Sequence, residues 1–196
     1  MTSAKEKMLN EEFYISWDQK LTEERELAKS LVFQLNQVDP THREERTAII
    51  KQLIPNIGKY FWIESPFSCD YGTNLIIGDN FYSNTNCTLL DCANIMIGND
   101  VLFGPNVSLY TPNHAFNAED RKEGWEQSLT IKIGDNVWLG GSVTVVDGVE
   151  IGKNSIIGAG SVVTKSIPEN CLAAGNPCRV FREITEEDRL NINKKA

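Results

Sequence analysis

The chain lacks the features that mark several large classes of protein. Its 196 residues contain no apolar run near the roughly 18 residues that a membrane-spanning helix needs. Its first residues are polar and lack the apolar core of a secretion signal. Acidic residues outnumber basic ones, and the net charge of −8 argues against a nucleic-acid-binding protein, which would normally carry a basic face. The sequence therefore predicts a cytoplasmic protein that binds neither membranes nor nucleic acids.

Cysteine and histidine do not occur in a pattern that would bind a metal. The five cysteines are odd in number and form no C-x-x-C pair, so neither a disulfide framework nor a zinc site is expected. There are two histidines, His42 and His114. We expect reduced, mostly buried cysteines and no catalytic metal.

What is present is an internal repeat of six residues. Eleven of its twelve repeat positions are apolar, and the residue that follows is glycine at seven of them. The tetrapeptides I-G-D-N, I-G-N-D and I-G-K-N recur, and Gly and Asn tolerate the positive φ of tight turns. The repeat positions are Ile77, Ser83, Leu89, Ile97, Phe103, Leu109, Ile133, Leu139, Val145, Ile151, Ile157 and Val163.

This period predicts a coil of short parallel strands. A helix requires a period of 3.6 residues, and an amphipathic strand has no compulsory turn every six residues. In a coil, each repeated side chain points inward and stacks on its equivalent in the next turn. The period is interrupted by two extra residues between Leu89 and Ile97, and by the polar segment 110–130. Functional residues tend to lie on such loops, so we expect the activity at 110–130.

The two ends of the chain are predicted to differ from the coil. Residues 1–56 form a helical segment that covers one end or one flank of the coil, residues 57–183 are the coil, and residues 184–196 are a tail. In the helical segment a row of leucines indicates one buried face, and a capping box marks a helix start. These residues are Leu27, Leu31 and Leu35, and Thr41 with Glu44. Thr185 with Asp188 predicts one short helix in the tail.

Several motifs resemble the maltose and galactoside O-acetyltransferases. Besides the repeat they are N-H-A-F in the loop, P-F-S-C-D-Y-G at 66–72, G-A-G-S-V-V-T-K at 158–165 and A-A-G-N-P-C-R-V at 173–180. The resemblance covers nearly the whole chain. It implies a mainly β fold, a left-handed parallel β-helix with an N-terminal α-helical segment and an extended loop, assembled as a homotrimer with active sites between subunits. It also implies transfer of an acetyl group from acetyl-CoA to a hydroxyl of a sugar.

The resemblance assigns catalysis to the loop histidine. A sugar hydroxyl is a poor nucleophile until its proton is removed, and an imidazole suits that task, so His114 is the expected general base. Asn84 matches the position that stabilises the transition state and contacts substrate, although it could also be an asparagine at a corner of the coil. Glu126 is a candidate to orient His114 through its other ring nitrogen, at a position where galactoside acetyltransferases have no carboxylate. We expect His42 to be a surface residue.

The acceptor is implied to bind to Asp18, Asp70, Asn84 and Trp138. Carboxylates suit this role because they accept hydrogen bonds from hydroxyl groups. Galactoside acetyltransferase has serine in place of Asp70 and a substrate-binding aspartate in place of Cys92, which favours a sugar of the glucose or maltose type. Asp18 could also be an ordinary residue at a helix start, and Trp138 could pack within the coil.

Acetyl-CoA is implied to bind along one edge of the coil. The family uses backbone amides there for the pantetheine arm, and side chains near the C-terminal end for the adenine and the phosphates. In an acidic chain such a basic cluster would neutralise the phosphates, and otherwise it is simply solvated. The corresponding residues are Gly141 and Ala159 for the amides, and Thr164, Lys165, Arg179 and Arg182 for the side chains.

Hexapeptide coils carry more than one function, so the fold alone does not decide between them. A γ-type carbonic anhydrase needs three zinc-binding histidines, and this chain has two. A purely structural protein and an O-acetyltransferase that modifies an antibiotic hydroxyl remain as alternatives. The second alternative usually lacks the N-terminal helices, which favours a sugar acceptor.

Overall fold

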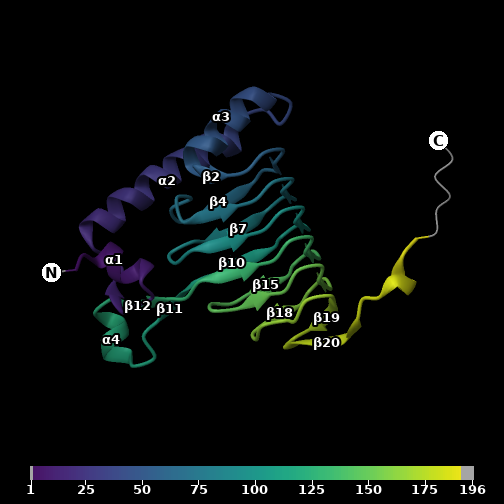
Figure 1. The fold of residues 1–196 in the computed structure, drawn as a ribbon. Helices are drawn as coiled ribbons and strands as arrows, with labels where there is room; N and C mark the ends of the chain where they lie inside the picture. Colours follow the sequence, from purple (N-terminus) through teal and green to yellow (C-terminus); the bar gives the residue numbers. More distant parts are fainter. Residues whose placement is uncertain (1, 191–196) are drawn as a thin grey trace.

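The structure is a three-sided coil with helices across its N-terminal end and a projection on one side (Figure 1). It is a computed structural model, and it describes residues 2–190. No helix in that range is both long and apolar enough to cross a membrane. The coil begins at Asn56 and ends in an antiparallel pair of strands that finishes at Glu183.

Each side of the coil is a ladder of strands from successive turns. The first side consists of β2 (Asn56–Ile57), β5 (Leu75–Ile77), β8 (Ile95–Ile97), β13 (Ile131–Ile133) and β16 (Glu150–Ile151). The second consists of β3 (Trp62–Ile63), β6 (Tyr82–Ser83), β9 (Leu102–Phe103), β14 (Trp138–Leu139), β17 (Ile156–Ile157), β19 (Cys171–Gly175) and β20 (Cys178–Glu183). The third consists of β4 (Phe67–Cys69), β7 (Cys87–Leu90), β10 (Ser108–Tyr110), β15 (Thr144–Val145) and β18 (Val162–Val163).

The repeat positions form the core, as predicted. Equivalent residues pair in register, for example Ile77 with Ile97 and Ile97 with Ile133. All twelve repeat positions are at most 4% exposed, Ser83 included. The five cysteines are free and buried. Apolar side chains stacked on their own equivalents therefore give a continuous core along the coil.

The corners explain why Gly and Asn recur. Asn136 and Asn154 adopt φ values of 57° and 60°, and the Asn136 amide donates to Asn154 Oδ1 at 2.9 Å, so the corner residues also form a ladder. A methyl group on Gly134 would lie 2.6 Å from the backbone nitrogen of Lys153 in the next turn. Glycine is therefore required where successive turns come closest.

The helical segment contains α1 (Ala4–Leu9), α2 (Gln19–Gln37) and α3 (Arg43–Leu53). In α2 the buried residues are Leu21, Ala28, Leu31 and Leu35. The prediction for Leu27 was wrong, because this side chain is 63% exposed. The buried residues of α2 are spaced by seven, three and four positions, so they lie on one face of the helix, and Ala28 belongs to that face. Leu27 precedes Ala28 by one residue and therefore lies about 100° away around the helix.

The predicted capping box at the start of α3 was also wrong. The N-cap is His42, whose side chain makes no capping hydrogen bond. Thr41 instead donates its amide and its hydroxyl to Asp39 Oδ1, at 2.8 and 2.7 Å. The local turn before the helix therefore uses the hydroxyl that was expected to cap it.

The segment 110–130 is an ordered projection. It contains β11 (Pro112–His114), α4 (Ala118–Lys122) and β12 (Trp125–Ser128), and β1 (Tyr14–Ile15) of the helical segment pairs with the other edge of β12. At the C-terminal end, the predicted short helix is confirmed as a single 3₁₀ turn, Glu186–Asp188. Positions 191–196 of the predicted tail lie outside the described residues.

Candidate functional site

Extra residues widen the same corner of the coil on three successive turns. Cys69, Leu89 and Leu109 are stacked equivalents. The next repeat position comes eight residues after Cys69 and eight residues after Leu89, instead of six. The projection follows Leu109. The three irregular segments therefore lie one above another, and they form the wall of a pocket.

A buried carboxylate holds the first widened turn in place. Asp91 is fully buried, and its Oδ1 accepts hydrogen bonds from the amides of Asp70 and Tyr71 at 3.0 and 2.8 Å. Its Oδ2 accepts a third from the amide of Asn74 at 3.3 Å. Burial raises the pKa of Asp91 to about 7 in spite of these bonds. Asp91 therefore fixes the backbone that carries Asp70.

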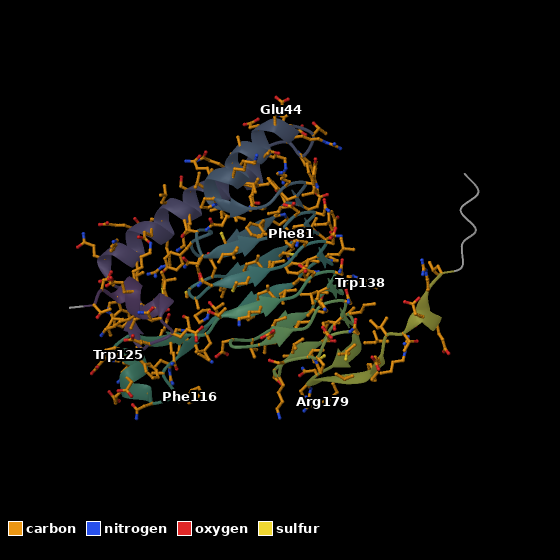
Figure 2. All side chains as sticks on the ribbon, in the orientation of Figure 1. Glu44, Phe81, Phe116, Trp125, Trp138 and Arg179 are labelled. Carbon is orange, nitrogen blue, oxygen red and sulfur yellow. The ribbon has the colours of Figure 1, made fainter. Side chains whose placement is uncertain are left out.

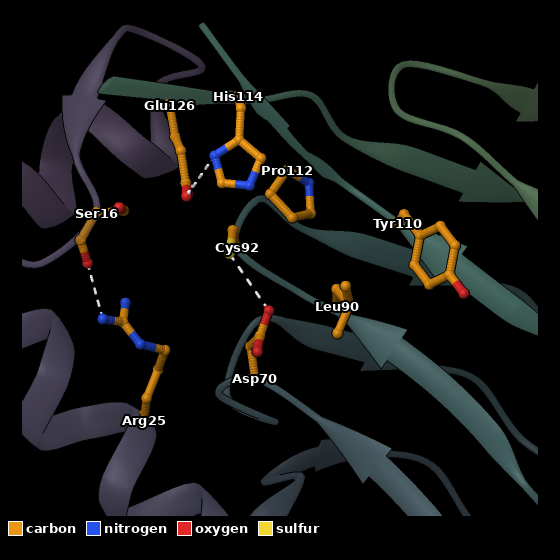
Figure 3. A pocket seen from close by; sticks show the side chains of 9 residues that line it. All are labelled: Ser16, Arg25, Asp70, Leu90, Cys92, Tyr110, Pro112, His114 and Glu126. Carbon is orange, nitrogen blue, oxygen red and sulfur yellow. Dashed lines mark hydrogen bonds and ion pairs between the residues drawn. The ribbon is translucent and has the colours of Figure 1, made fainter. Parts of the chain in front are cut away.

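A pocket of about 470 Å³ opens at this corner (Figure 3). Its volume falls within the roughly 300 to 1,000 Å³ of small-molecule sites. Its lining residues are Ser16, Arg25, Asp70, Leu90, Cys92, Tyr110, Pro112, His114 and Glu126. Among residues 2–190, no three His, Cys, Asp or Glu side chains gather closely enough to hold a metal ion.

One histidine and one carboxylate meet at the rim of this pocket. His114 on β11 lies opposite Glu126 on β12, and its Nδ1 is 3.2 Å from Glu126 Oε1. The histidine side chain is 69% exposed, whereas that of Glu126 is only 13% exposed. In Figure 3 the other ring nitrogen of His114 is turned away from Glu126 and toward the middle of the pocket.

A carboxylate and a guanidinium face each other across the opposite part of the pocket. The Cys92 thiol donates to Asp70 Oδ2 at 3.5 Å. Burial raises the pKa of Asp70, and the Cys92 hydrogen bond and the Arg25 charge act against that shift. Arg25 donates to the Tyr71 hydroxyl at 2.6 Å and to the Ser16 carbonyl at 2.7 Å. These contacts hold the guanidinium at the pocket wall (Figure 3).

The structure brings His114, Glu126 and Asp70 into one pocket and places Asp18 outside its lining. Asp18 is the N-cap of α2, and its Oδ1 accepts from the amides of Lys20 and Leu21 at 3.0 and 3.2 Å. Ser16 and Arg25 of the N-terminal segment line the pocket, and no motif or spacing in the sequence pointed to them. The eight-residue spacing after Cys69 is the signal in the sequence that indicates the pocket.

Asn84 lies on another edge of the coil, in one column with Gly104, Gly140 and Gly158. Its amide donates to the Phe103 carbonyl at 3.0 Å, and the amide of Gly104 donates to Leu139 in the same way at 2.8 Å. The residues that directly follow this column in the sequence form a second column beside it. Gly141 and Ala159 are neighbours in this second column, since the amide of Gly160 donates to the Gly141 carbonyl at 2.9 Å. Asn84 and the two expected amide positions therefore share one edge.

The other expected CoA contacts lie toward the C-terminal end of the coil. Thr164, Lys165 and Arg179 are exposed. Arg182 forms a two-point ion pair with Asp188, at 2.8 and 2.6 Å, which lowers the pKa of Asp188 to about 2.

Trp138 is half exposed on the outer face of β14, so it does not pack inside the coil. Figure 2 shows Trp138 and Arg179 on the opposite side of the molecule from Trp125 and Phe116 of the projection.

Two family models match the chain. Residues 7–58 match the maltose acetyltransferase hexapeptide capping motif, and residues 130–165 match the bacterial transferase hexapeptide of six repeats. A galactoside O-acetyltransferase of Escherichia coli is 46% identical over 86% of this chain and 83% of its own length. One of Lactococcus lactis is 43% identical over 91% of this chain and 86% of its own length.

Solved structures agree with these matches. A maltose O-acetyltransferase from Clostridium difficile superposes with a TM-score of 0.92 at 45% identity, covering 94% of this chain and 98% of that one. A galactoside acetyltransferase in complex with coenzyme A gives a TM-score of 0.92 at 41% identity, covering 96% and 94%. The predicted left-handed β-helix of hexapeptide repeats is thereby confirmed. The chain belongs to the family of the maltose and galactoside O-acetyltransferases.

Proposed function

We propose that this chain transfers the acetyl group of acetyl-CoA to a hydroxyl group of a sugar, and that sugars of the glucose or maltose type are favoured. The observation that carries the proposal is the contact between His114 and Glu126 at the rim of a sugar-sized pocket. The relatives named above support it, because they are galactoside and maltose O-acetyltransferases that match this chain over most of its length.

His114 acts as the general base, and Glu126 orients it. With the Nδ1 proton directed at the Glu126 carboxylate, Nε2 has a free lone pair toward the pocket. Nε2 takes the proton of the sugar hydroxyl while the hydroxyl oxygen bonds to the thioester carbon. The carbon–sulfur bond then breaks, and the departing thiolate takes the proton from the imidazolium. No acyl-enzyme intermediate is required.

The edge that carries Asn84 suits the donor substrate. Acetyl-CoA supplies an acetyl group activated as a thioester. Gly141 and Ala159 present backbone with no side chain larger than a methyl group, so an extended arm can lie against their amides. Asn84 on the same edge would donate to the charge that develops on the carbonyl oxygen. The adenine and phosphate contacts are assigned to Thr164, Lys165, Arg179 and Arg182.

The two halves of this machinery belong to different copies of the chain. In one copy the projection with His114 lies on the opposite side from Trp138 and Arg179 (Figure 2). A homotrimer with the site between neighbouring subunits brings the base of one copy to the donor edge and Trp138 of the next. Sedimentation of the protein as a trimer is the expected result, and a monomer with full activity would contradict this arrangement.

The acceptor is held by the polar wall of the pocket. The Asp70 carboxylate accepts from sugar hydroxyls, and Ser16 and Arg25 complete the polar lining. Cys92 occupies the place of a substrate-binding aspartate in galactoside acetyltransferase, and its thiol is committed to Asp70. By the resemblance, galactoside acetyltransferase also has one carboxylate at these two positions, but it has it in place of Cys92, whereas this chain has it at Asp70. The different position of the carboxylate favours glucose-type sugars over β-galactosides.

A panel of acceptors tests the proposed activity. Thiol release from acetyl-CoA is measured with maltose, glucose, galactosides and hydroxylated antibiotics. We expect turnover with the glucose-type sugars and a KM in the millimolar range. Turnover of antibiotics alone would replace the sugar with a xenobiotic acceptor, and no thiol release with any acceptor would leave a structural hexapeptide protein.

Asp70→Asn tests the acceptor wall. We expect KM for the sugar to rise on the order of tenfold, since a hydrogen bond to a charged group contributes about 1.5–3 kcal/mol. KM for acetyl-CoA should not change. The matched control is Asp100→Asn, because Asp100 lies at a coil corner where other turns already use asparagine and it accepts from Asn80 at 2.9 Å. An unchanged sugar KM in Asp70→Asn would remove Asp70 from the acceptor site.

A further inference from the structure

A tyrosine of the N-terminal segment lies directly behind the carboxylate that contacts His114. The Tyr14 hydroxyl donates to Glu126 Oε2 at 3.0 Å, and it lies 3.0 Å from Ser128 Oγ. The other oxygen of the same carboxylate, Oε1, is the one that contacts His114 Nδ1. Each oxygen of Glu126 therefore has one partner, and Tyr14 is only 1% exposed.

The sheet of the projection explains this alignment. In the order β1-β12-β11, Tyr14 is directly opposite Glu126, and Glu126 is directly opposite His114. Directly opposed residues point to the same face of a sheet, so the three side chains form one row. Ser128 lies two residues farther along β12 and shares that face. Strand β1 thus brings to the site a hydroxyl from 112 residues away in the sequence.

The direction of the hydrogen bonds in this row is fixed by chemistry. A carboxylate only accepts, and a phenol has one proton, so the proton of Tyr14 points to Glu126. The remaining contact of Tyr14 then requires Ser128 to donate to the phenol oxygen. Burial raises the pKa of Tyr14 far above its usual range, so the phenol stays protonated. Tyr14 is thus a permanent donor to the carboxylate.

We propose that Tyr14 is a positioning residue for the acetyl transfer. The His114 ring is largely exposed, so its orientation depends on Glu126, and Glu126 is a flexible side chain that needs a second anchor. By donating to Oε2, Tyr14 fixes the carboxylate so that Oε1 faces Nδ1 and Nε2 faces the pocket. The N-terminal segment therefore supports the general base as well as covering the coil. This inference rests on the proposed function.

Tyr14→Phe is the direct test, since it keeps the buried ring and removes the hydroxyl. We expect kcat to fall on the order of tenfold with both KM values within about twofold, as for loss of one hydrogen bond to a charged group. A carboxylate that has lost a donor is a stronger base and stabilises the imidazolium more. The acid limb of the pH–kcat profile should therefore move to higher pH.

A double-mutant cycle shows whether Tyr14 acts through Glu126. In a Glu126→Ala background the phenol has no carboxylate to hold, so adding Tyr14→Phe should change kcat less than about twofold. Ser128→Ala removes only the donor to the phenol oxygen, and we expect it to lower kcat less than Tyr14→Phe does. It also serves as the test if Tyr14→Phe does not fold.

Ser155→Ala is the matched control for loss of a buried hydroxyl. Ser155 is fully buried, donates to the Pro168 carbonyl at 2.8 Å and accepts from the Cys171 amide at 3.1 Å. It should lower the melting temperature and leave the pH–kcat profile unchanged.

A folded Tyr14→Phe protein with wild-type kcat and an unshifted acid limb would overturn the inference. An equal fall of kcat when Tyr14→Phe is added to the Glu126→Ala background would also overturn it. If wild-type protein is active and His114→Ala is not, these results reject only the role of Tyr14; an inactive wild-type protein rejects the proposed function itself.

Discussion

Replacement of His114 by alanine is expected to lower kcat by about 10²- to 10⁴-fold, the usual contribution of a general base. The imidazole interacts with the hydroxyl only as its proton leaves, so KM for either substrate should change little. The measurement is thiol release from acetyl-CoA at saturating sugar. The loss should be the same with every sugar that the enzyme accepts, because the base acts on the proton and not on the rest of the acceptor.

The second histidine provides the control. His42 is exposed at the start of α3, and its Nδ1 lies 3.4 Å from Glu45 Oε2. His42→Ala removes an imidazole of similar exposure from a place outside the pocket, and it should retain wild-type turnover. If His114→Ala also turns over like wild type, the contact with Glu126 has no catalytic meaning, and the proposed mechanism is lost.

The coil was predictable because its cause is local. Each turn needs an inward apolar side chain, a glycine where the backbones meet and a residue that tolerates positive φ, and all three recur every six residues. Leu27 shows the limit of this reasoning in the helices. A helix face is defined by tertiary contacts, and a row that starts one residue later, at Ala28, changes which side chains are buried.

The site was only partly predictable, because strand pairing across long separations leaves no period in the sequence. His114 and Glu126 were selected together, and they face each other across one hairpin. Tyr14 was not selected, since its partner is on a strand far along the chain. Asp18 and Ser16 show the same limit. Both precede α2, but the backbone amides at the helix start take up the carboxylate of Asp18, and Ser16 is the one that reaches the pocket.

Replacement of Arg46 by alanine is expected to destabilise the protein on the order of 3 kcal/mol or more, because it removes a buried donor group and leaves a cavity. Arg46 on α3 is 1% exposed. Its guanidinium donates to the Leu35 carbonyl at 3.2 Å and to the Ile63 carbonyl at 2.7 Å. Without it, the buried Ile63 carbonyl would lose its donor, and the Leu35 carbonyl would keep only the Ser65 hydroxyl, at 3.5 Å. The measurement is urea unfolding at a fixed protein concentration, since an oligomer gains stability from association.

The position of these carbonyls explains why a buried charge is tolerated there. Leu35 lies in the last turn of α2, where the helix dipole places partial negative charge, and Ile63 belongs to β3 at the start of the coil. Arg46 therefore joins α2, α3 and the first turn of the coil through one guanidinium. Arg46 also lies over the Trp62 ring, with its Cζ 5.8 Å from the ring centroid. Arg43→Ala is the matched control, because Arg43 is exposed on the same helix and lies over the same ring, at 5.4 Å. We expect it to cost less than about 1 kcal/mol. Equal losses from the two variants would mean that contact with Trp62, and not the buried carbonyls, makes Arg46 important.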